Sequence, residues 1–138
     1  MKVGVNMFND FELIQYERLA AFIGITAYII LLIASDQSEA KLIAEETEDK
    51  SLESTGDPSV TTAIASFLLF LNTIILANNA FVRLYKKKQD IINGKETDSI
   101  VPNINISTGF IFGIIGNSLR LLGALQKASE SGDNITIL

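Results

Sequence analysis

Long stretches without a charged residue dominate the pattern of hydrophobic and polar positions in this chain. There are three of them, and they cover residues 19–35, 58–82 and 99–119. They are 17, 25 and 21 residues long, whereas an α-helix needs about 20 residues to cross about 30 Å of hydrocarbon. The pattern predicts an all-α integral membrane protein in which three transmembrane helices pack as a small bundle.

In this interpretation one membrane domain accounts for the whole chain of 138 residues. If about half of the chain lies in lipid, no room is left for a separate soluble enzyme domain. We expect the three spans at about 13–35, 58–84 and 103–126, with an acidic outer loop at 36–57 and a basic cytoplasmic loop at 83–98.

Helix-capping residues predict where the first two helices begin and end. Asp57 followed by Pro58 is typical of a helix start, with Asp as the N-cap and Pro at the first helical position. Gly94 is the first residue that would end this second helix. The spacing of Asn9 and Glu12 resembles a capping box, which predicts that the first helix starts at Asn9 or Asp10.

The third helix and the acidic loop give weaker signals. Pro102 marks the approach to a helix that we expect to begin between Asn103 and Ser107 and to end near residues 131–132. In the acidic loop, residues 38–48 could form a short surface helix. No EF-hand spacing is present there, so we expect a solvated loop rather than a calcium site.

Two other interpretations of the apolar stretches remain open. The first stretch is short enough for the apolar region of a signal peptide, although the acids Asp10, Glu12 and Glu17 before it are untypical of such a leader. A wholly soluble helical fold is the second alternative, because Glu17, Arg18 and Arg120 lie directly against the apolar runs.

The two expected loops carry opposite charge. Residues 36–57 hold eight acids and two bases, a net charge of -6, and residues 83–98 hold five bases and three acids, a net charge of +2. Short loops rich in Lys and Arg stay in the cytoplasm. We therefore expect a cytoplasmic N-terminus and an outer C-terminus, in the plasma membrane or a bacterial inner membrane.

Small residues recur at heptad spacing on all three expected helices. In the third helix, Arg120 and Lys127 share this register with the glycines. Small side chains let helix backbones approach closely in lipid, which favours a tight left-handed bundle over the alternative of a glycine-lined pore or ligand groove. The predicted helix-packing residues are Gly24, Ala63, Ala77, Gly109, Gly113, Gly116 and Gly123.

Among the asparagines of the uncharged stretches, we expect Asn72, Asn79 and Asn117 to be polar residues inside the membrane. Hydrogen bonds between membrane helices are worth about 0.6 to 2 kcal/mol each, which is enough to set the register of the helices. If the second and third helices are antiparallel, we expect Asn78 and Asn79 to meet residues 105–108, and Asn117 to meet Thr61, Thr62 or Ser66.

Arg120 is the only ionisable residue that we expect inside the membrane. We place it close to the outer surface, where its side chain can extend to the lipid headgroups. The alternative pairs Arg120 with an acid of the outer loop or of a partner subunit.

A basic cluster, Arg83, Lys86, Lys87 and Lys88, follows the second uncharged stretch. At a cytoplasmic surface each base is worth about 1 kcal/mol of attraction to anionic lipids. The cluster is therefore predicted to contact lipid headgroups. It is short and poor in aromatic residues, so we expect no nucleic-acid partner.

The residues that the chain lacks restrict its function. It has no Cys and no His, which removes thiolate chemistry, the commonest general base and the commonest metal ligand. The uncharged stretches hold no carboxylate for coupled transport. We therefore expect no enzyme activity, no metal and no cofactor.

The remaining features favour a structural or accessory subunit, embedded in the lipid bilayer, of a homo- or hetero-oligomeric membrane assembly. Its partners would be copies of itself or larger membrane subunits. The alternative is a pore-forming oligomer, holin-like or channel-like, lined by the Asn and Thr face of the second helix. The strongly basic C-terminal tail that is usual in holins is missing.

Overall fold

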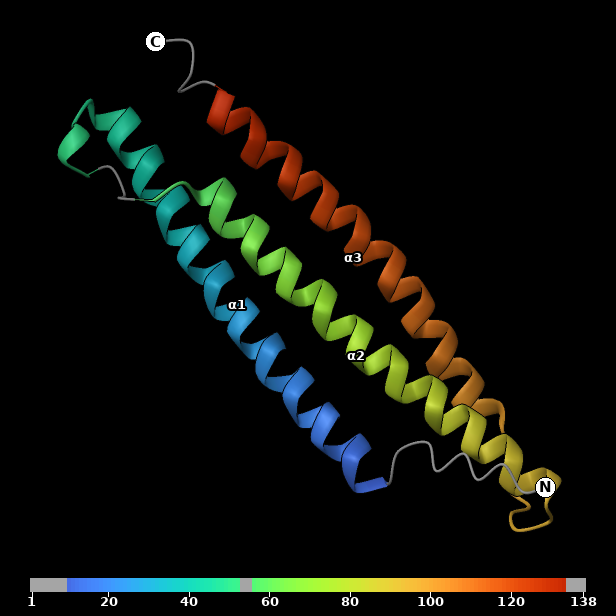
Figure 1. The fold of residues 1–138 in the computed structure, drawn as a ribbon. Coiled ribbons are helices and arrows are strands. Elements are labelled where there is room, and N and C mark those ends of the chain that lie inside the picture. Colours follow the sequence, from blue (N-terminus) through green and yellow to red (C-terminus); the bar gives the residue numbers. More distant parts are fainter. Residues whose placement is uncertain (1–9, 53–55, 134–138) are drawn as a thin grey trace.

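The computed structural model describes residues 10–52 and 56–133. Three long helices make up nearly all of this part: α1 (Asp10–Thr47), α2 (Pro58–Ile92) and α3 (Val101–Asp133) (Figure 1). A short 3-10 helix, η1 (Lys50–Leu52), follows α1. Each of the three α-helices is long and apolar enough to cross a membrane.

The central helix of the fold is α2, which lies between α1 and α3 and runs antiparallel to both (Figure 1). Both outer helices pack on α2, and within the described residues they do not contact each other. The start of α1 and the loop between α2 and α3 lie at one end, which we call the α2–α3 loop end. The start of α2 and the end of α3 lie at the opposite end, which we call the α1–α2 loop end.

The predicted boundaries of α2 are confirmed. The Asp57 carboxylate accepts a hydrogen bond of 2.8 Å from the backbone N–H of Ser59, and Pro58 is the first helical residue. At the other end Gly94 adopts a positive φ of 70°, which a residue without Cβ tolerates. The N–H groups of Gly94 and Lys95 then donate to two of the last carbonyls of α2.

Helix α1 is longer than expected, because it continues through residues 36–47, which we had assigned to the acidic loop. The predicted short surface helix at 38–48 is therefore the last part of α1. The segment contains no Gly or Pro and is rich in Ala, Leu, Lys and Glu, which favour helix. The helix ends where Glu48 adopts a positive φ of 56°.

Helix α3 begins at Val101, before the expected range of 103–107. The Ser99 hydroxyl accepts a hydrogen bond of 3.2 Å from the N–H of Val101, the first residue of the helix. Pro102 lies in the first turn, where its missing N–H leaves no hydrogen bond unmade.

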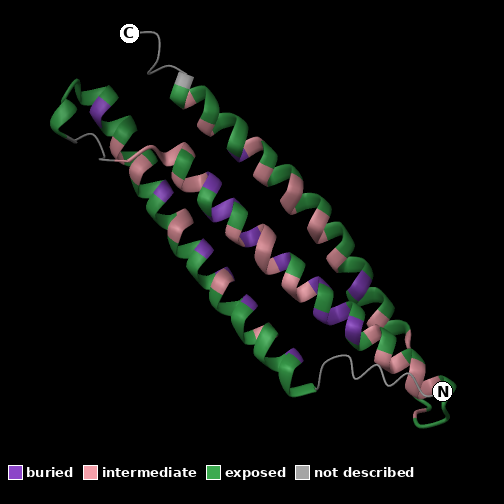
Figure 2. Ribbon diagram, viewed as in Figure 1, coloured by how far each residue is buried: buried purple, intermediate pink, exposed green. Residues whose placement is uncertain are grey.

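The buried residues lie mainly along α2 and on the side of α1 that faces it (Figure 2). Most of them are small, whereas many large apolar residues are exposed on the surface. Ala20, Ala27 and Ala65 are completely buried, whereas Phe22 is 70% exposed and Phe112 is 69% exposed. Leu13 is the only large aliphatic side chain among the fully buried residues of the described part. Proteins that fold in water show the opposite distribution, with their large apolar side chains inside.

Candidate functional site

One side of α2 faces α1, and we call its polar residues Asn72, Asn79, Arg83 and Lys86 the α1-facing stripe. Asn79 is only 2% exposed, and its Nδ2 donates a hydrogen bond of 2.8 Å to the backbone oxygen of Leu13. A Cβ on Gly24 would lie 3.0 Å from Nδ2 of Asn72, so the Asn72 amide packs against the glycine backbone. The expectation that Asn79 meets the third helix is therefore wrong.

A second side of α2 faces α3, and it contains the residues that directly follow Asn72 and Asn79 in the sequence. We call its residues Ser59, Ser66, Thr73 and Ala80 the α3-facing stripe. Asn117 donates from Nδ2 to Oγ1 of Thr73 at 2.7 Å. The Ser107 hydroxyl lies 3.4 Å from the carbonyl oxygen of Ala80, to which it donates.

The α3-facing stripe also makes contact at the α1–α2 loop end. There the hydroxyl of Ser131 lies 3.3 Å from that of Ser59. The predicted partners of Asn117 were Thr61, Thr62 or Ser66, and they lie about two to three turns of α2 away from its actual partner, Thr73.

Neighbouring residues let one turn of α2 serve both outer helices. Consecutive residues of an α-helix point about 100° apart, because a turn takes 3.6 residues. Asn72 therefore faces α1 while Thr73 faces α3, and seven residues later Asn79 and Ala80 repeat the arrangement. Asn78 points to neither helix and is exposed. The Asn and Thr face of α2 is covered by α1 and α3 within one chain.

Several buried oxygens near these stripes lack a hydrogen-bond partner among the described residues. They are Oδ1 of Asn72, Oδ1 of Asn79, Oγ of Ser66 and Oε1 of Gln37. An unmade hydrogen bond of a buried polar group costs about 1–3 kcal/mol. The asparagines therefore fix the position of α1 on α2 at the expense of some stability.

The predicted packing residues divide into two groups. Gly24, Ala63 and Ala77 are buried between helices, and a Cβ on Gly113 would lie 3.3 Å from the methyl group of Thr73. By contrast, a Cβ on any of three glycines of α3 would have no described heavy atom within 4 Å, apart from its own helix backbone and chain neighbours. These open glycines are Gly109, Gly116 and Gly123.

Of the glycines in the predicted pattern, only Gly113 thus lies against α2, and the side of α3 that carries Gly109, Gly116 and Gly123 is not the side that packs on α2. Ser107 and Ala124 are the residues of α3 that are buried in the contact. The hydroxyl of Ser107 and the amide of Asn117 hydrogen-bond to α2, whereas a glycine has no side chain that could do so. The polar residues of α3, rather than its glycines, therefore select the side that faces α2.

The position of Arg120 also differs from the expectation. Counting along the antiparallel helices from the pair Asn117 and Thr73 places Arg120 level with Phe70 of α2. Phe70 is the midpoint of the uncharged stretch 58–82. Arg120 is exposed, and it lies beside the middle of the apolar part of α2 rather than near its end.

The length of α2 explains this shift. Helix α2 continues for ten residues beyond Val82, and only residues 93–100 connect it to α3. The first turns of α3 must therefore run beside the charged end of α2. As a result the uncharged stretches of the two helices are offset along the axis, although each is apolar by itself.

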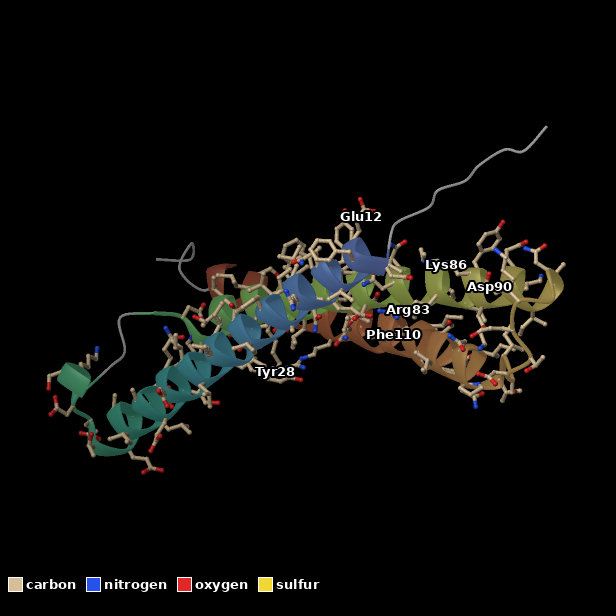
Figure 3. The ribbon with its side chains drawn as sticks, turned by 90° about the horizontal axis from the view of Figure 1, so that it is seen from below. Glu12, Tyr28, Arg83, Lys86, Asp90 and Phe110 are labelled. Atoms are coloured by element: carbon tan, nitrogen blue, oxygen red, sulfur yellow. The ribbon has the colours of Figure 1, made fainter. Side chains whose placement is uncertain are left out.

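Ion pairs gather at the α2–α3 loop end (Figure 3). Arg83 lies 2.9 Å from the carboxylate of Glu17, and Lys86 lies 2.5 Å from that of Asp10, so both bases connect α2 to the first turns of α1. The hydrogen bond from Lys86, with the attraction of its charge, lowers the pKa of Asp10. The sequence signal for these pairs is a group of acids at the start of one helix and a group of bases at the end of the next, which antiparallel packing brings together.

Lys87 points instead toward the loop that leads to α3. Its Nζ lies 2.6 Å from the Glu96 carboxylate and 3.8 Å from that of Asp98. The hydrogen bond to Glu96 raises the pKa of Lys87, against the effect of burial. Three of the four residues assigned to lipid headgroups are thus paired with acids of the same chain, and Lys88 is exposed without an ion pair among the described residues.

No catalytic arrangement is apparent among these residues. Within residues 10–52 and 56–133, no group of three or more acids, histidines or cysteines is placed to hold a metal ion. Comparison of the chain with protein-family models, with curated proteins and with solved structures gave no match.

Proposed function

We propose that this chain is a non-enzymatic integral membrane protein that serves as a structural or accessory subunit of a larger membrane assembly. The observation that carries the proposal is the distribution of side-chain size between interior and surface. Ala, Gly, Ser and Asn fill the contacts between helices, and Phe, Ile and Leu cover the outside of all three. That arrangement is stable only where the surroundings are as apolar as the side chains that face them.

The proposed orientation places the α2–α3 loop end in the cytoplasm and the α1–α2 loop end outside. The bases of the α2–α3 loop end support this orientation, because the topology rule counts Lys and Arg and not net charge. Arg83 and Lys86 also neutralise the acids at the start of α1. The exposed Lys88 is left to attract anionic lipids.

Detergent dependence tests the proposal directly. The full chain, expressed in bacteria, should stay in the membrane pellet after washing with alkaline carbonate and should enter solution only with detergent. A monodisperse, helical protein in plain buffer would overturn the membrane assignment. A stoichiometric larger protein that copurifies in mild detergent would support an accessory role, and a purified assembly that catalyses a reaction by itself would contradict it.

A pore lined by the Asn and Thr face of α2 is the competing function. In that case Asn72, Thr73 and Asn79 would have to leave α1 and α3, which cover them within the chain. Conductance across a planar bilayer distinguishes the two functions. The accessory role predicts no current from the purified chain, and steady single-channel steps would favour the pore.

A further inference from the structure

One side of α3 is left uncovered by the rest of the chain. It carries the open glycines Gly109, Gly116 and Gly123, and between the last two it carries Arg120. Lys127 lies seven residues beyond Arg120 and so shares its side of the helix. We call this the open side of α3. Its glycines show only that the backbone of another helix can come close. The charge of Arg120 indicates which kind of side chain such a helix would present.

Arg120 has no carboxylate within reach among the described residues of the chain. The stretches of α1 and α2 that flank it, residues 19–35 and 58–82, contain no acid. On α3 the nearest acid is Glu130, which lies ten residues and therefore about 15 Å further along the axis. No ion pair joins Arg120 to any residue of the described part of the chain.

This position is costly in a membrane. A guanidinium does not lose its proton in proteins, so Arg120 stays charged. Near the middle of a membrane helix an arginine costs about 2.5–3.5 kcal/mol on insertion scales, and such residues almost always pair with another group. A carboxylate accepts two parallel hydrogen bonds from a guanidinium and is the best match for it.

The open side of α3 borders the space between α1 and α3. Lys127 lines a hollow of about 180 Å³ together with Ser38 of α1, Thr62 of α2 and Ala124 of α3. Within the described residues α1 and α3 do not contact each other, so that neither helix closes this space. Arg120 lies two turns from Lys127 along the same side of α3, nearer the middle of the fold.

A second copy of the chain does not supply the missing acid. The uncharged stretches contain none, and copies in one membrane share one orientation. Contact between the open sides of two copies would bring Arg120 close to its own equivalent, and like charges repel. Lipid phosphates lie at the membrane surface, level with the ends of the uncharged stretch 58–82 of α2 and not with Phe70.

We propose that the open side of α3 binds a transmembrane helix of a different protein, one that carries Asp or Glu near its middle and pairs it with Arg120. This inference rests on the proposed membrane role and makes it specific, because it requires a hetero-oligomeric assembly. The glycines let the partner backbone approach, and the ion pair fixes its depth and identity.

Designed peptides provide the test without knowledge of the natural partner. The probes are 21-residue Leu/Ala helices with Lys at both ends and a single central Asp, Leu or Lys. Each carries an acceptor dye, and association with the donor-labelled full chain is measured by energy transfer in phosphatidylcholine vesicles. We expect the Asp peptide to associate about tenfold more tightly than the Leu peptide, as one strong interhelical pair allows.

Exchange of the charges makes the test specific. The Arg120→Glu variant should no longer bind the Asp peptide and should bind the Lys peptide instead. The Gly116→Leu variant, which keeps Arg120, should bind the Asp peptide more weakly. Arg18→Glu is the matched control, because Arg18 is exposed at the end of an apolar stretch, and it should change nothing. Equal binding of the Asp and Leu peptides, or Asp binding that survives Arg120→Glu, would overturn the proposal.

Failure of this inference is distinguishable from failure of the proposed function. If the chain inserts into the vesicles and resists carbonate but binds the Asp, Leu and Lys peptides equally, the proposed partner surface is refuted and the membrane role stands. If the chain does not insert at all, the carbonate wash already contradicts the membrane role. Loss of helix in Arg120→Glu by circular dichroism would shift the test to Arg120→Leu, which should lose the Asp peptide and gain no other.

Discussion

The two interfaces of α2 are built differently. Against α1, α2 meets a row of small residues that includes Ala20, Gly24 and Ala27, and ion pairs close the contact at the α2–α3 loop end. Against α3, contact relies on hydrogen bonds spaced along the helix, and few residues of α3 are buried. Helix α1 therefore uses its small residues within the chain, whereas α3 leaves most of its glycines outside.

This difference indicates the role of each outer helix. A contact made by small residues and closed by ion pairs holds α1 in one position on α2. The contact with α2 leaves a second side of α3 uncovered, and this is the side on which we proposed a partner helix. The contrast leads to predictions about which substitutions destabilise the chain itself and which leave it intact.

Leucine substitutions in the glycines should give the largest effect. In Gly24→Leu the new side chain has to displace Asn72, and overpacking of this kind costs about 1–3 kcal/mol. Gly113→Leu should cost less, since only the Thr73 methyl group stands at the Cβ position, and Gly116→Leu should leave the isolated chain unchanged. Thermal unfolding in detergent, followed by circular dichroism, measures this order. Equal loss of stability in Gly24→Leu and Gly116→Leu would refute the distinction between the two helices.

Asparagine substitutions should act locally and more weakly. Asn117→Leu removes the hydrogen bond to Thr73, and we expect a loss of about 0.6–2 kcal/mol with faster amide hydrogen exchange in α3. Asn79→Leu should speed up exchange in α1 instead, because Asn79 binds Leu13. The exposed Asn78 gives the control Asn78→Leu, which should alter neither helix. Faster exchange in both helices from each single variant would show that the interfaces are not independent.

Acidification should loosen the start of α1 and leave α3 in place. The pKa of Asp10 is lower in the folded chain than in the unfolded one, so its pairing with Lys86 stabilises the fold above the ordinary pKa of Asp and is lost as pH falls through the folded value. We expect proteolysis near residue 10 to increase below about pH 4. Asp10→Asn should remove this pH dependence, and a dependence that persists in that variant would contradict the assignment.

Alkaline pH should act on the connection to α3. The pKa of Lys87 is raised in the folded chain, mainly by its hydrogen bond to Glu96. The stabilisation is complete below the ordinary pKa of Lys, about 10.4, and is lost as pH rises through the folded value. Because the Glu96 side chain is 41% exposed and water screens the pair, we expect a small effect, visible as faster motion of a spin label placed in the 93–100 loop. Glu96→Gln should abolish it.

Much of the fold could be predicted from the sequence, because local chemistry decides it. Three charge-free stretches are sufficient to predict three helices, and Asp57, Pro58 and Gly94 define the limits of α2 through capping that depends on adjacent residues only. The change from apolar to acidic composition after residue 35 predicts the end of a membrane span, but it does not end the helix, and α1 continues to Thr47. Helix propensity continued across that change.

The relations between helices were harder to predict. Asn72 and Asn79 were expected to be polar contacts, but their partners depend on which side of α2 each outer helix occupies. From the sequence, Arg120 borders the end of the uncharged stretch 99–119. In the structure, the length of α2 and the short loop after it place Arg120 level with the middle of the stretch 58–82 of α2. Depth is thus a property of the packed helices and cannot be read from one helix alone.

The depth of residue 119 tests the central claim most directly. The chain contains no Cys, so that a single spin label can be placed at the exposed Leu119 beside Arg120, or at Ile25, which lies at the same level on α1. In lipid vesicles the account predicts that labels in Leu119→Cys and Ile25→Cys are equally deep, near the bilayer centre, with high exposure to oxygen and low exposure to a water-soluble nickel complex. A label at residue 119 that lies at the headgroups or in water, while that at residue 25 is deep, would contradict it.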